Sequence, residues 1–266
     1  MTQKSDKWVT DWFGATAQDW ACPAFADRVL YIPTSSDRTV TEHCASVLGD
    51  ELERADRFLT GRGRANFIQR RAFRRYCGAV ASGTPLSQIA FEETENGRPY
   101  LPEHPKLWFS FSSCRLGFLG AWSSTHAIGI DLEDQNGEIE ASELARSYFT
   151  ISEAQAVEEA GPARLRTFLQ LWSLKEAALK SIGEGLPFGL DTFAFELNGA
   201  LRVRSVPRDH GAPDRFAAHI FEHADVCAAL VGRPALFHDA LPLLETGFSA
   251  LKTQPRPVRK ISSDIS

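Results

Sequence analysis

Two short segments of the chain combine residue types that could bind a metal ion and act on a phosphate group. In the first, residues 129–133, apolar and polar residues alternate as they do along a half-buried strand. Asp131 and Glu133 therefore share one face of that strand, where neighbouring carboxylates raise each other's pKa. A cation between them removes this penalty, and an all-oxygen ligand set suits magnesium. The alternative is a solvated strand edge that carries two acids.

The second segment, residues 172–180, has a helical pattern and places Glu176 and Lys180 four residues apart. Residues at this spacing lie on one helix face, together with Trp172. An ordinary surface ion pair has the same spacing and contributes only about 0.2–0.5 kcal/mol, and Lys175 and Lys180 could both be solvated. With the two strand acids, however, Glu176 completes three carboxylates beside a lysine. That combination suits a magnesium-dependent reaction of a phosphate-containing substrate.

Arginines are concentrated in the N-terminal part of the chain. Residues 54–75 contain eight arginines and one acidic residue, Asp56, although the whole chain has a net charge of −5. Arg70 and Arg74 are four residues apart, and so they lie on one side of a helix. A concentrated cationic field on an acidic protein favours binding of a specific anion, and the overall charge gives no indication of a nucleic-acid partner.

The chain lacks the features of several other protein classes. It has no Gly-x-x-x-x-Gly-Lys-[Ser/Thr] loop, and residues 183–185 are not a dinucleotide-binding fingerprint. The five cysteines include no Cys-x-x-Cys pair, which argues against a thiolate metal site or a disulfide framework. No apolar run approaches the roughly 18 residues that span a bilayer, and the first residues do not resemble a signal peptide. We therefore expect a cytoplasmic protein with no membrane partner.

Hydrophobic periodicity and the positions of Gly and Pro predict the elements that position these residues. Helices are expected within residues 40–82, 141–160 and 163–182, with breaks near 61–63 and 150–152 and an end at Gly183. Strands are expected over residues 28–32, 89–92, 108–112, 116–122, 127–133, 191–197, 200–205, 215–222 and 225–232. The strands 116–122 and 127–133 are expected to pair as a hairpin.

The order of these elements, helices and then strands, occurs twice along the chain. It favours two similar α+β halves, residues 21–126 and 127–235. An N-terminal extension at 1–20 and a mobile polar tail at 236–266 complete the expected division.

Together these segments resemble a known family. The sequences Gly-Ile-Asp-Leu-Glu (129–133) and Trp-Ser-Leu-Lys-Glu-Ala-Ala-Leu-Lys (172–180) are similar to the two acidic motifs of the 4′-phosphopantetheinyl transferases. Within that family, the sequence resembles the larger type, known as the surfactin-synthetase-activator type, in which one chain forms a pseudo-dimer. The resemblance extends to the arginine-rich helices and to the turn at 96–99, and covers about residues 45–235. It implies an α+β fold of two halves related by a pseudo-two-fold axis, with the active site between them.

The resemblance implies a transfer of the 4′-phosphopantetheine arm of coenzyme A to a serine of an acyl or peptidyl carrier protein, with release of 3′,5′-ADP. Asp131, Glu133 and Glu176 match the family's magnesium ligands, with manganese as the alternative ion. Glu176 also matches the base for the serine hydroxyl, and Lys180 matches the residue that stabilises or protonates the leaving phosphate. The positions assigned to coenzyme binding are Arg54, Arg70, Arg98, Ser112, Ser113 and Lys180. An internal pseudo-dimer would make the protein a monomer.

One position departs from the family pattern. Ser113 stands where the family usually has a histidine that contacts a coenzyme phosphate. A hydroxyl carries no charge, and loss of a charge-assisted contact costs about 1.5–3 kcal/mol. Arg115 would share the strand face of Ser113, and replace the charge, if the strand continued. Otherwise coenzyme binding is weak or the donor differs. Two rival functions stay open: a non-catalytic relative that binds coenzyme A or a carrier protein, and a magnesium-dependent phosphohydrolase.

Overall fold

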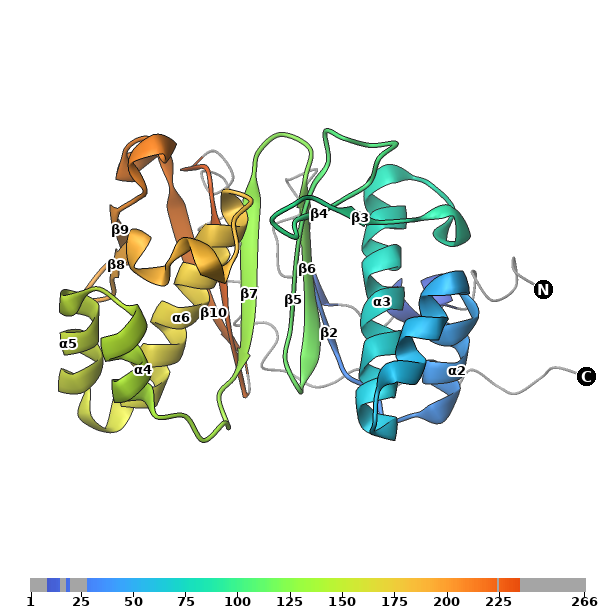
Figure 1. Ribbon diagram of the computed structural model, residues 1–266, viewed down its shortest axis with the longest axis horizontal. Helices are drawn as coiled ribbons and strands as arrows, with labels where there is room; N and C mark the ends of the chain where they lie inside the picture. Colours follow the sequence, from blue (N-terminus) through green and yellow to red (C-terminus); the bar gives the residue numbers. More distant parts are fainter. Residues whose placement is uncertain (1–8, 15–17, 20–27, 224, 235–266) are drawn as a thin grey trace, which may run out of the picture.

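The computed structural model describes residues 9–14, 18–19, 28–223 and 225–234 (Figure 1). Residues 9–14 are helical, and the α-helices that follow are α2 (Arg38–Ser46), α3 (Gly61–Ser82), α4 (Ala141–Tyr148), α5 (Ile151–Glu159) and α6 (Arg164–Ser181). The strands are β1 (Gln18–Asp19), β2 (Arg28–Pro33), β3 (Glu92–Glu93), β4 (Pro99–Tyr100), β5 (Trp108–Ser113), β6 (Gly117–Ser123), β7 (Ile128–Asp134), β8 (Ala194–Glu196), β9 (Arg202–Ser205), β10 (Ala217–His223) and β11 (Val226–Gly232). The tail predicted at 236–266 lies outside the described residues, as does most of the extension predicted at 1–20.

Two antiparallel sheets form the centre of the molecule. One has the strand order β1-β2-β6-β5 and the other the order β10-β11-β7. β2 pairs with β6, and β7 pairs with β11. The predicted hairpin between 116–122 and 127–133 is therefore wrong, because β6 and β7 follow each other in sequence but belong to different sheets. The combination of helices with antiparallel sheets confirms the α+β class.

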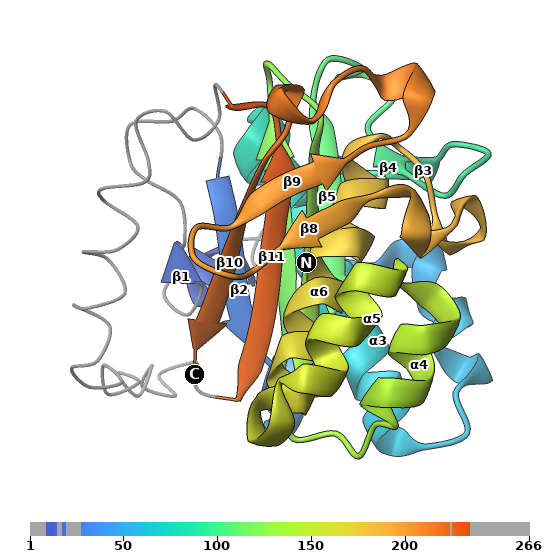
Figure 2. The same ribbon diagram turned by 90° about the vertical axis from the view of Figure 1, so that its left-hand side faces the viewer.

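The two sheets face each other, and helices cover their outer faces. Figure 1 shows α2 and α3 beside the sheet that contains β5 and β6, and Figure 2 shows α4, α5 and α6 in front of the sheet that contains β7. Apolar side chains fill the space under each helical layer and between the sheets. Alternation along β7 places Ile128, Ile130 and Leu132 on one apolar face, and this face packs between the sheets. Asp131 and Glu133 consequently turn towards α6.

At one edge the two sheets adjoin, because β5 runs beside β7. The Trp108 indole N–H donates to Ile128 O at 2.8 Å, and the Ile130 N–H donates to Ser110 Oγ at 3.0 Å. These bonds connect β5 to the strand that carries the acidic motif, β7. The candidate site lies at this junction.

α6 lies directly on β7 because residue 129 has no side chain. A Cβ atom at Gly129 would lie 1.9 Å from Ala177 O and 2.4 Å from Ser181 N, both backbone atoms of α6. Glycine is the residue that permits such a close backbone approach. Ala177 and Ser181 directly follow Glu176 and Lys180, so this contact brings the charged side chains of α6 to the polar face of β7.

Local sequence accounts for several helix ends. Thr150 and Glu153 form a capping box that begins α5, which confirms the interruption predicted at 150–152. Gly183, with a φ of +81°, follows the end of α6 as predicted. None of the helices in the described part of the chain combines the length and hydropathy that crossing a membrane requires.

Two predicted elements differ from the structure. The helical segment predicted over 40–82 is divided further, into α2, a 3-10 helix over Gly49–Arg57, and α3, which starts after the Thr60 cap. Of the strand predicted over 89–92, Glu92 alone lies in β3. A 3-10 turn leads into that segment, and Ile89 is buried in the core under α3 without a strand partner.

Candidate active site

Asp131 is the centre of the candidate site. It lies in β7 and is 3% exposed. Its Oδ1 atom accepts hydrogen bonds from Lys180 Nζ at 2.7 Å and from Ser112 Oγ at 2.8 Å. Its Oδ2 atom is buried and has no hydrogen-bond partner within the described part of the chain. A buried carboxylate oxygen without a partner is costly, and so Oδ2 is suited to bind a further ligand.

Glu176 and Lys180 reach this carboxylate from α6. Lys180 Nζ also lies 3.7 Å from Glu176 Oε2. Burial alone would lower the pKa of Lys180, but the negative charges of Asp131 and Glu176 outweigh burial and raise it. Burial, followed by the charge of Asp131, raises the pKa of Glu176. The pair at i and i+4 is therefore part of a partly buried cluster and not a fully solvated surface pair.

Glu133 belongs to the same electrostatic group. Burial raises the pKa of Glu133 to about 7, with further contributions from the negative charges of Asp131 and Glu176. Lys180 and a hydrogen bond with the Trp172 side chain oppose this shift. The structure thus places the three predicted carboxylates within electrostatic reach of one another, where additional positive charge is stabilising.

These carboxylates fit a divalent cation by their chemistry. The donor set consists of oxygens, and its negative charge is not fully compensated, as the unpartnered Asp131 Oδ2 and the raised pKa of Glu133 show. Among the described residues, however, no group of three or more His, Cys, Asp or Glu side chains is gathered closely enough to hold a metal ion as it stands. Lys180 supplies positive charge at this point, and coordination would require side chains to rotate.

The N-terminal arginines line a pocket beside Ser112, which we call the arginine pocket. Arg70 Nη1 lies 3.4 Å from Ser113 Oγ, and the Arg74 guanidinium packs over the ring of Phe111. Burial lowers the pKa of Arg70, and the nearby positive charges of Arg71 and Arg54 lower it further. An anion would relieve that repulsion. The residues that line the pocket are Arg54, Phe67, Arg70, Arg71, Arg74, Glu93, Phe111, Ser112 and Ser113.

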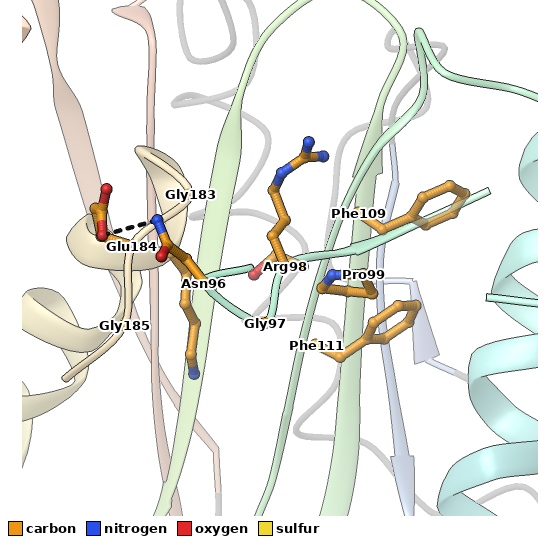
Figure 3. A pocket seen from close by; sticks show the side chains of 11 residues that line it. Asn96, Gly97, Arg98, Pro99, Phe109, Phe111, Gly183, Glu184 and Gly185 are labelled. Carbon is orange, nitrogen blue, oxygen red and sulfur yellow. Dashed lines mark hydrogen bonds between the residues drawn. The ribbon is translucent and has the colours of Figure 1, made fainter. Parts of the chain in front are cut away.

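Arg98 and Lys180 line a different pocket, which we call the turn pocket (Figure 3). Its walls include the turn Asn96–Pro99, the phenylalanines of β5 and the segment 183–185. The Arg98 guanidinium stacks on the Trp108 ring at 4.1 Å. Phe111 lines both pockets. The residues predicted to contact coenzyme A therefore lie in two adjoining pockets and not in one.

Arg115 does not replace the charge that is missing at Ser113. The strand β5 ends at Ser113, so the condition for this compensation is not met. Arg115 instead contacts Asp134 Oδ2 through Nε at 2.9 Å and Nη2 at 2.8 Å. It is absent from the described lining of the arginine pocket. Arg70, from α3, is the cation that contacts Ser113.

A buried ion pair behind α6 was not predicted from the sequence. Lys175 is fully buried, with Nζ 2.7 Å from Glu153 Oε2, and it donates to the carbonyl oxygens of Leu190 and Phe193. Glu153 Oε1 accepts from the Phe195 N–H at 2.9 Å. The pair thus joins α5 and α6 to the segment before β8. The Thr150-x-x-Glu153 pattern indicates a capping box, but no local signal shows that a distant lysine pairs with that glutamate.

Comparison with known proteins agrees with this geometry. The family model of the 4′-phosphopantetheinyl transferase superfamily matches residues 127–231, which include β7 and α6. The chain is 30% identical over 154 residues to 4′-phosphopantetheinyl transferase psf-1 of Bacillus pumilus, covering 57% of this chain and 64% of that protein. It is 33% identical over 125 residues to a 4′-phosphopantetheinyl transferase of Bacillus subtilis, covering 46% and 54%. With a phosphopantetheinyl transferase of Thraustochytrium sp. it shares 28% identity over 223 residues, covering 77% and 76%.

The matches to the two Bacillus proteins cover less than two thirds of those relatives' lengths. The region matched by the family model nevertheless contains Asp131, Glu133, Glu176 and Lys180, the charged residues that the fold brings together. The motifs, the fold class and the similar sequences agree: the part of the chain that carries both acidic motifs is similar to the 4′-phosphopantetheinyl transferase superfamily.

Proposed function

We propose that the protein transfers the 4′-phosphopantetheine arm of coenzyme A to a serine of an acyl or peptidyl carrier protein and releases 3′,5′-ADP. The names of its relatives support this class of reaction. The observation in this chain that carries the proposal is the environment of Asp131. One of its oxygens is held by Lys180 and Ser112, and the other is buried without a partner in the described residues. This arrangement suits a site that holds a cation and a phosphate group together.

In the proposed mechanism, Asp131, Glu133 and Glu176 would hold Mg²⁺, with Mn²⁺ as the alternative, and the ion would supply positive charge to the phosphate and to the serine hydroxyl. Glu176 would accept the proton of that hydroxyl; because a bound cation lowers the pKa of its carboxylate ligands, this role depends on the ion also acidifying the hydroxyl. The serine oxygen forms a bond to the phosphorus that carries the pantetheine arm. The bond from that phosphorus to the oxygen of 3′,5′-ADP breaks, and Lys180 stabilises the negative charge on this leaving group.

The phosphates of coenzyme A would lie across the two pockets. Arg54 and Arg70, with Ser112 and Ser113, would contact one phosphate group in the arginine pocket, and Arg98 and Lys180 another in the turn pocket. Two features support one ligand spanning both. Phe111 lines both pockets, and the hydrogen bonds from Ser112 and Lys180 to Asp131 connect their walls.

We also propose that residues 21–126 and 127–235 are two similar halves related by a pseudo-two-fold axis. The strand orders β2-β6-β5 and β7-β11-β10 support this. In the first half, β2 pairs with the last strand, β6, and β6 pairs with β5. In the second half, β7 pairs in the same way with the last strand, β11, and β11 pairs with β10. A long helix covers the outer face of each sheet, α3 on one and α6 on the other. A protein with such an internal repeat would act as a monomer, and we place it in the cytoplasm as part of the same proposal.

Intact-mass spectrometry of apo carrier proteins tests the proposed transfer. Each member of a panel of acyl and peptidyl carriers would be incubated with the protein, coenzyme A and Mg²⁺, with and without chelator. We expect a chelator-sensitive mass gain of about 340 Da, the covalent addition of one phosphopantetheine arm. The variant Asp131→Asn should give no gain under the same conditions.

Two other results would favour the rival functions. Coenzyme binding by calorimetry without a mass gain on any carrier would indicate a non-catalytic relative, and would make Ser113 the first position to examine. Release of 3′,5′-ADP from coenzyme A in the absence of any carrier would indicate a phosphohydrolase.

A further inference from the structure

A hydrogen bond joins two parts of the chain that are far apart in sequence. Asn96 Nδ2 donates to Glu184 Oε2 at 3.1 Å, as the dashed line in Figure 3 shows. Asn96 lies in the turn between β3 and β4, and Glu184 lies just beyond the end of α6. Both residues line the turn pocket, but neither carries positive charge. A carboxylate in a pocket proposed for phosphates therefore needs an explanation.

The backbone holds Glu184 in a fixed relation to Lys180. The Glu184 N–H donates to Leu179 O at 3.0 Å, and the Gly183 N–H donates to Lys180 O at 3.1 Å. With Gly183 at a positive φ, these two bonds form a Schellman motif, which terminates α6 tightly. The position of the Glu184 backbone is thus set by the helix that carries Lys180.

The turn holds Asn96 in a fixed relation to Arg98 in the same way. The Gly97 N–H donates to Thr94 O at 2.8 Å, the Thr94 N–H donates to Arg98 O at 3.0 Å, and the Arg98 N–H donates to Thr94 Oγ1 at 3.1 Å. These bonds close a compact turn. Displacement of Asn96 would therefore displace Arg98 as well.

The two segments are also in contact at Gly183. A Cβ atom there would lie 3.7 Å from the Trp108 ring and 3.8 Å from Arg98 Cδ. The end of α6 consequently packs against the Trp108–Arg98 stack without a side chain between them. The hydrogen bond from Asn96 to Glu184 fixes the lateral position of the turn on this surface.

We propose that Asn96 and Glu184 form a latch that holds the turn 94–98 against the end of α6 and so sets the position of Arg98 relative to Lys180. Both are positioning residues. The proposal rests on the proposed function, because Arg98 and Lys180 are taken to bind the phosphates of coenzyme A. It explains why a carboxylate lies in this pocket: Glu184 acts as a hydrogen-bond acceptor for Asn96, and its negative charge is not required.

The test separates the acceptor from the charge. Glu184→Gln keeps an acceptor oxygen and removes the charge, Glu184→Ala removes both, and Asn96→Ala removes the donor and keeps the charge. Glu95→Ala, at an exposed position of the same turn, is the matched control. Two measurements are made on each variant: amide hydrogen exchange of residues 94–98 in the free protein, and kcat and KM for coenzyme A on a carrier that the wild type modifies.

A latch predicts the following results. Glu184→Ala and Asn96→Ala raise KM for coenzyme A and accelerate exchange in the turn, each by roughly two- to twelvefold, the range for one ordinary hydrogen bond. kcat stays within about twofold, as expected when ground-state and transition-state binding are lost equally. Glu184→Gln and Glu95→Ala behave like the wild type in exchange and do not raise KM. The double variant Asn96→Ala/Glu184→Ala is no worse than either single variant.

Other results would overturn the latch. If Glu184→Gln and Glu184→Ala change KM equally while Asn96→Ala has no effect, Glu184 acts through its charge alone. If Glu184→Ala leaves exchange at 94–98 unchanged, the hydrogen bond does not hold the turn. If the wild-type protein modifies no carrier, the proposed function fails, whereas the exchange measurement still decides between a held and an unheld turn.

Discussion

Lys180 Nζ and Asp131 Oδ1 lie 2.7 Å apart, although the first belongs to α6 and the second to β7. Ser112 donates to the same oxygen from β5. A single carboxylate oxygen therefore connects the helix to both sheets, while the second oxygen of Asp131 is buried without a partner in the described residues. The two oxygens have separate roles in this arrangement: Oδ1 orders the surrounding side chains, and Oδ2 is the one suited to a cation.

Asp131→Asn should remove cation binding while the protein still folds, because asparagine keeps an oxygen that can accept from Lys180 and Ser112. In the wild type, Mg²⁺ at a hundredfold excess over its dissociation constant should stabilise the folded state by about 2.7 kcal/mol. We expect this stabilisation to disappear in Asp131→Asn. The measurement is chemical unfolding with Mg²⁺ and with chelator.

Glu138→Gln, at an exposed position of the loop after β7, is the control for general electrostatic effects. It should keep the full response to Mg²⁺. Equal stabilisation of wild type and Asp131→Asn by Mg²⁺ would contradict the assignment of Asp131 as a ligand.

Gly129→Ala should destabilise the protein and disturb the site together. The new Cβ would lie 1.9 Å from Ala177 O, and α6 must move away from β7 to accommodate it. Overpacking of this kind costs about 1–3 kcal/mol, occasionally more. Displacement of α6 also separates Lys180 from Asp131, so transfer activity should fall further than the loss of folded protein explains. Urea unfolding and kinetics on the folded fraction measure the two effects.

Gly137→Ala is a suitable comparison for that substitution. A Cβ atom at Gly137 would have its nearest contact at 3.6 Å, to the side chain of Ile139. The free energy of unfolding should change by less than about 0.5 kcal/mol. If Gly129→Ala were as mild as Gly137→Ala, the close approach of α6 would not require a glycine.

The parts of the fold that could be predicted are those that local sequence determines. Alternation identified β7 and its acidic face, and Gly183 marked the end of α6. Strand pairing was not local: β7 pairs with β11, nearly a hundred residues later, and not with the preceding strand. The sequence gives no signal that distinguishes a tight hairpin from two consecutive strands that enter different sheets.

The candidate site shows the same division. The carboxylates and Lys180 could be predicted because two motifs contain them, and the structure brings Asp131 and Glu176 to Lys180. The separation of Arg98 from Arg70 into two pockets depends on how the turn at 96–99 packs against Gly183, a contact between segments far apart in sequence. Arg115 was predicted from its spacing to share a strand face with Ser113. In the structure its side chain forms an ion pair with Asp134 instead, a contact that the spacing does not indicate.

Lys175→Met should destabilise the protein strongly without a direct effect on the phosphate site. Methionine leaves Glu153 as a buried charge without its cation, and it removes the donor to the carbonyl groups of Leu190 and Phe193. Breaking a buried ion pair on one side costs about 3–5 kcal/mol. Urea unfolding measures this loss. Lys106→Met, at an exposed position, should change stability by less than about 0.5 kcal/mol, and a similarly small change in Lys175→Met would show that the pair is dispensable.

Ser113→His should strengthen coenzyme binding, because the imidazole would add a cationic or strongly polar donor to the arginine pocket. A charge-assisted hydrogen bond contributes about 1.5 kcal/mol or more, which corresponds to roughly tenfold tighter binding. Calorimetry with coenzyme A measures the difference between the variant and the wild type. Arg115→Ala is the control: its side chain contacts Asp134 and does not line the described pocket, so affinity should stay within twofold, about 0.4 kcal/mol. Unchanged or weaker binding in Ser113→His would mean that Arg70, which already contacts Ser113, supplies the charge that this chain needs.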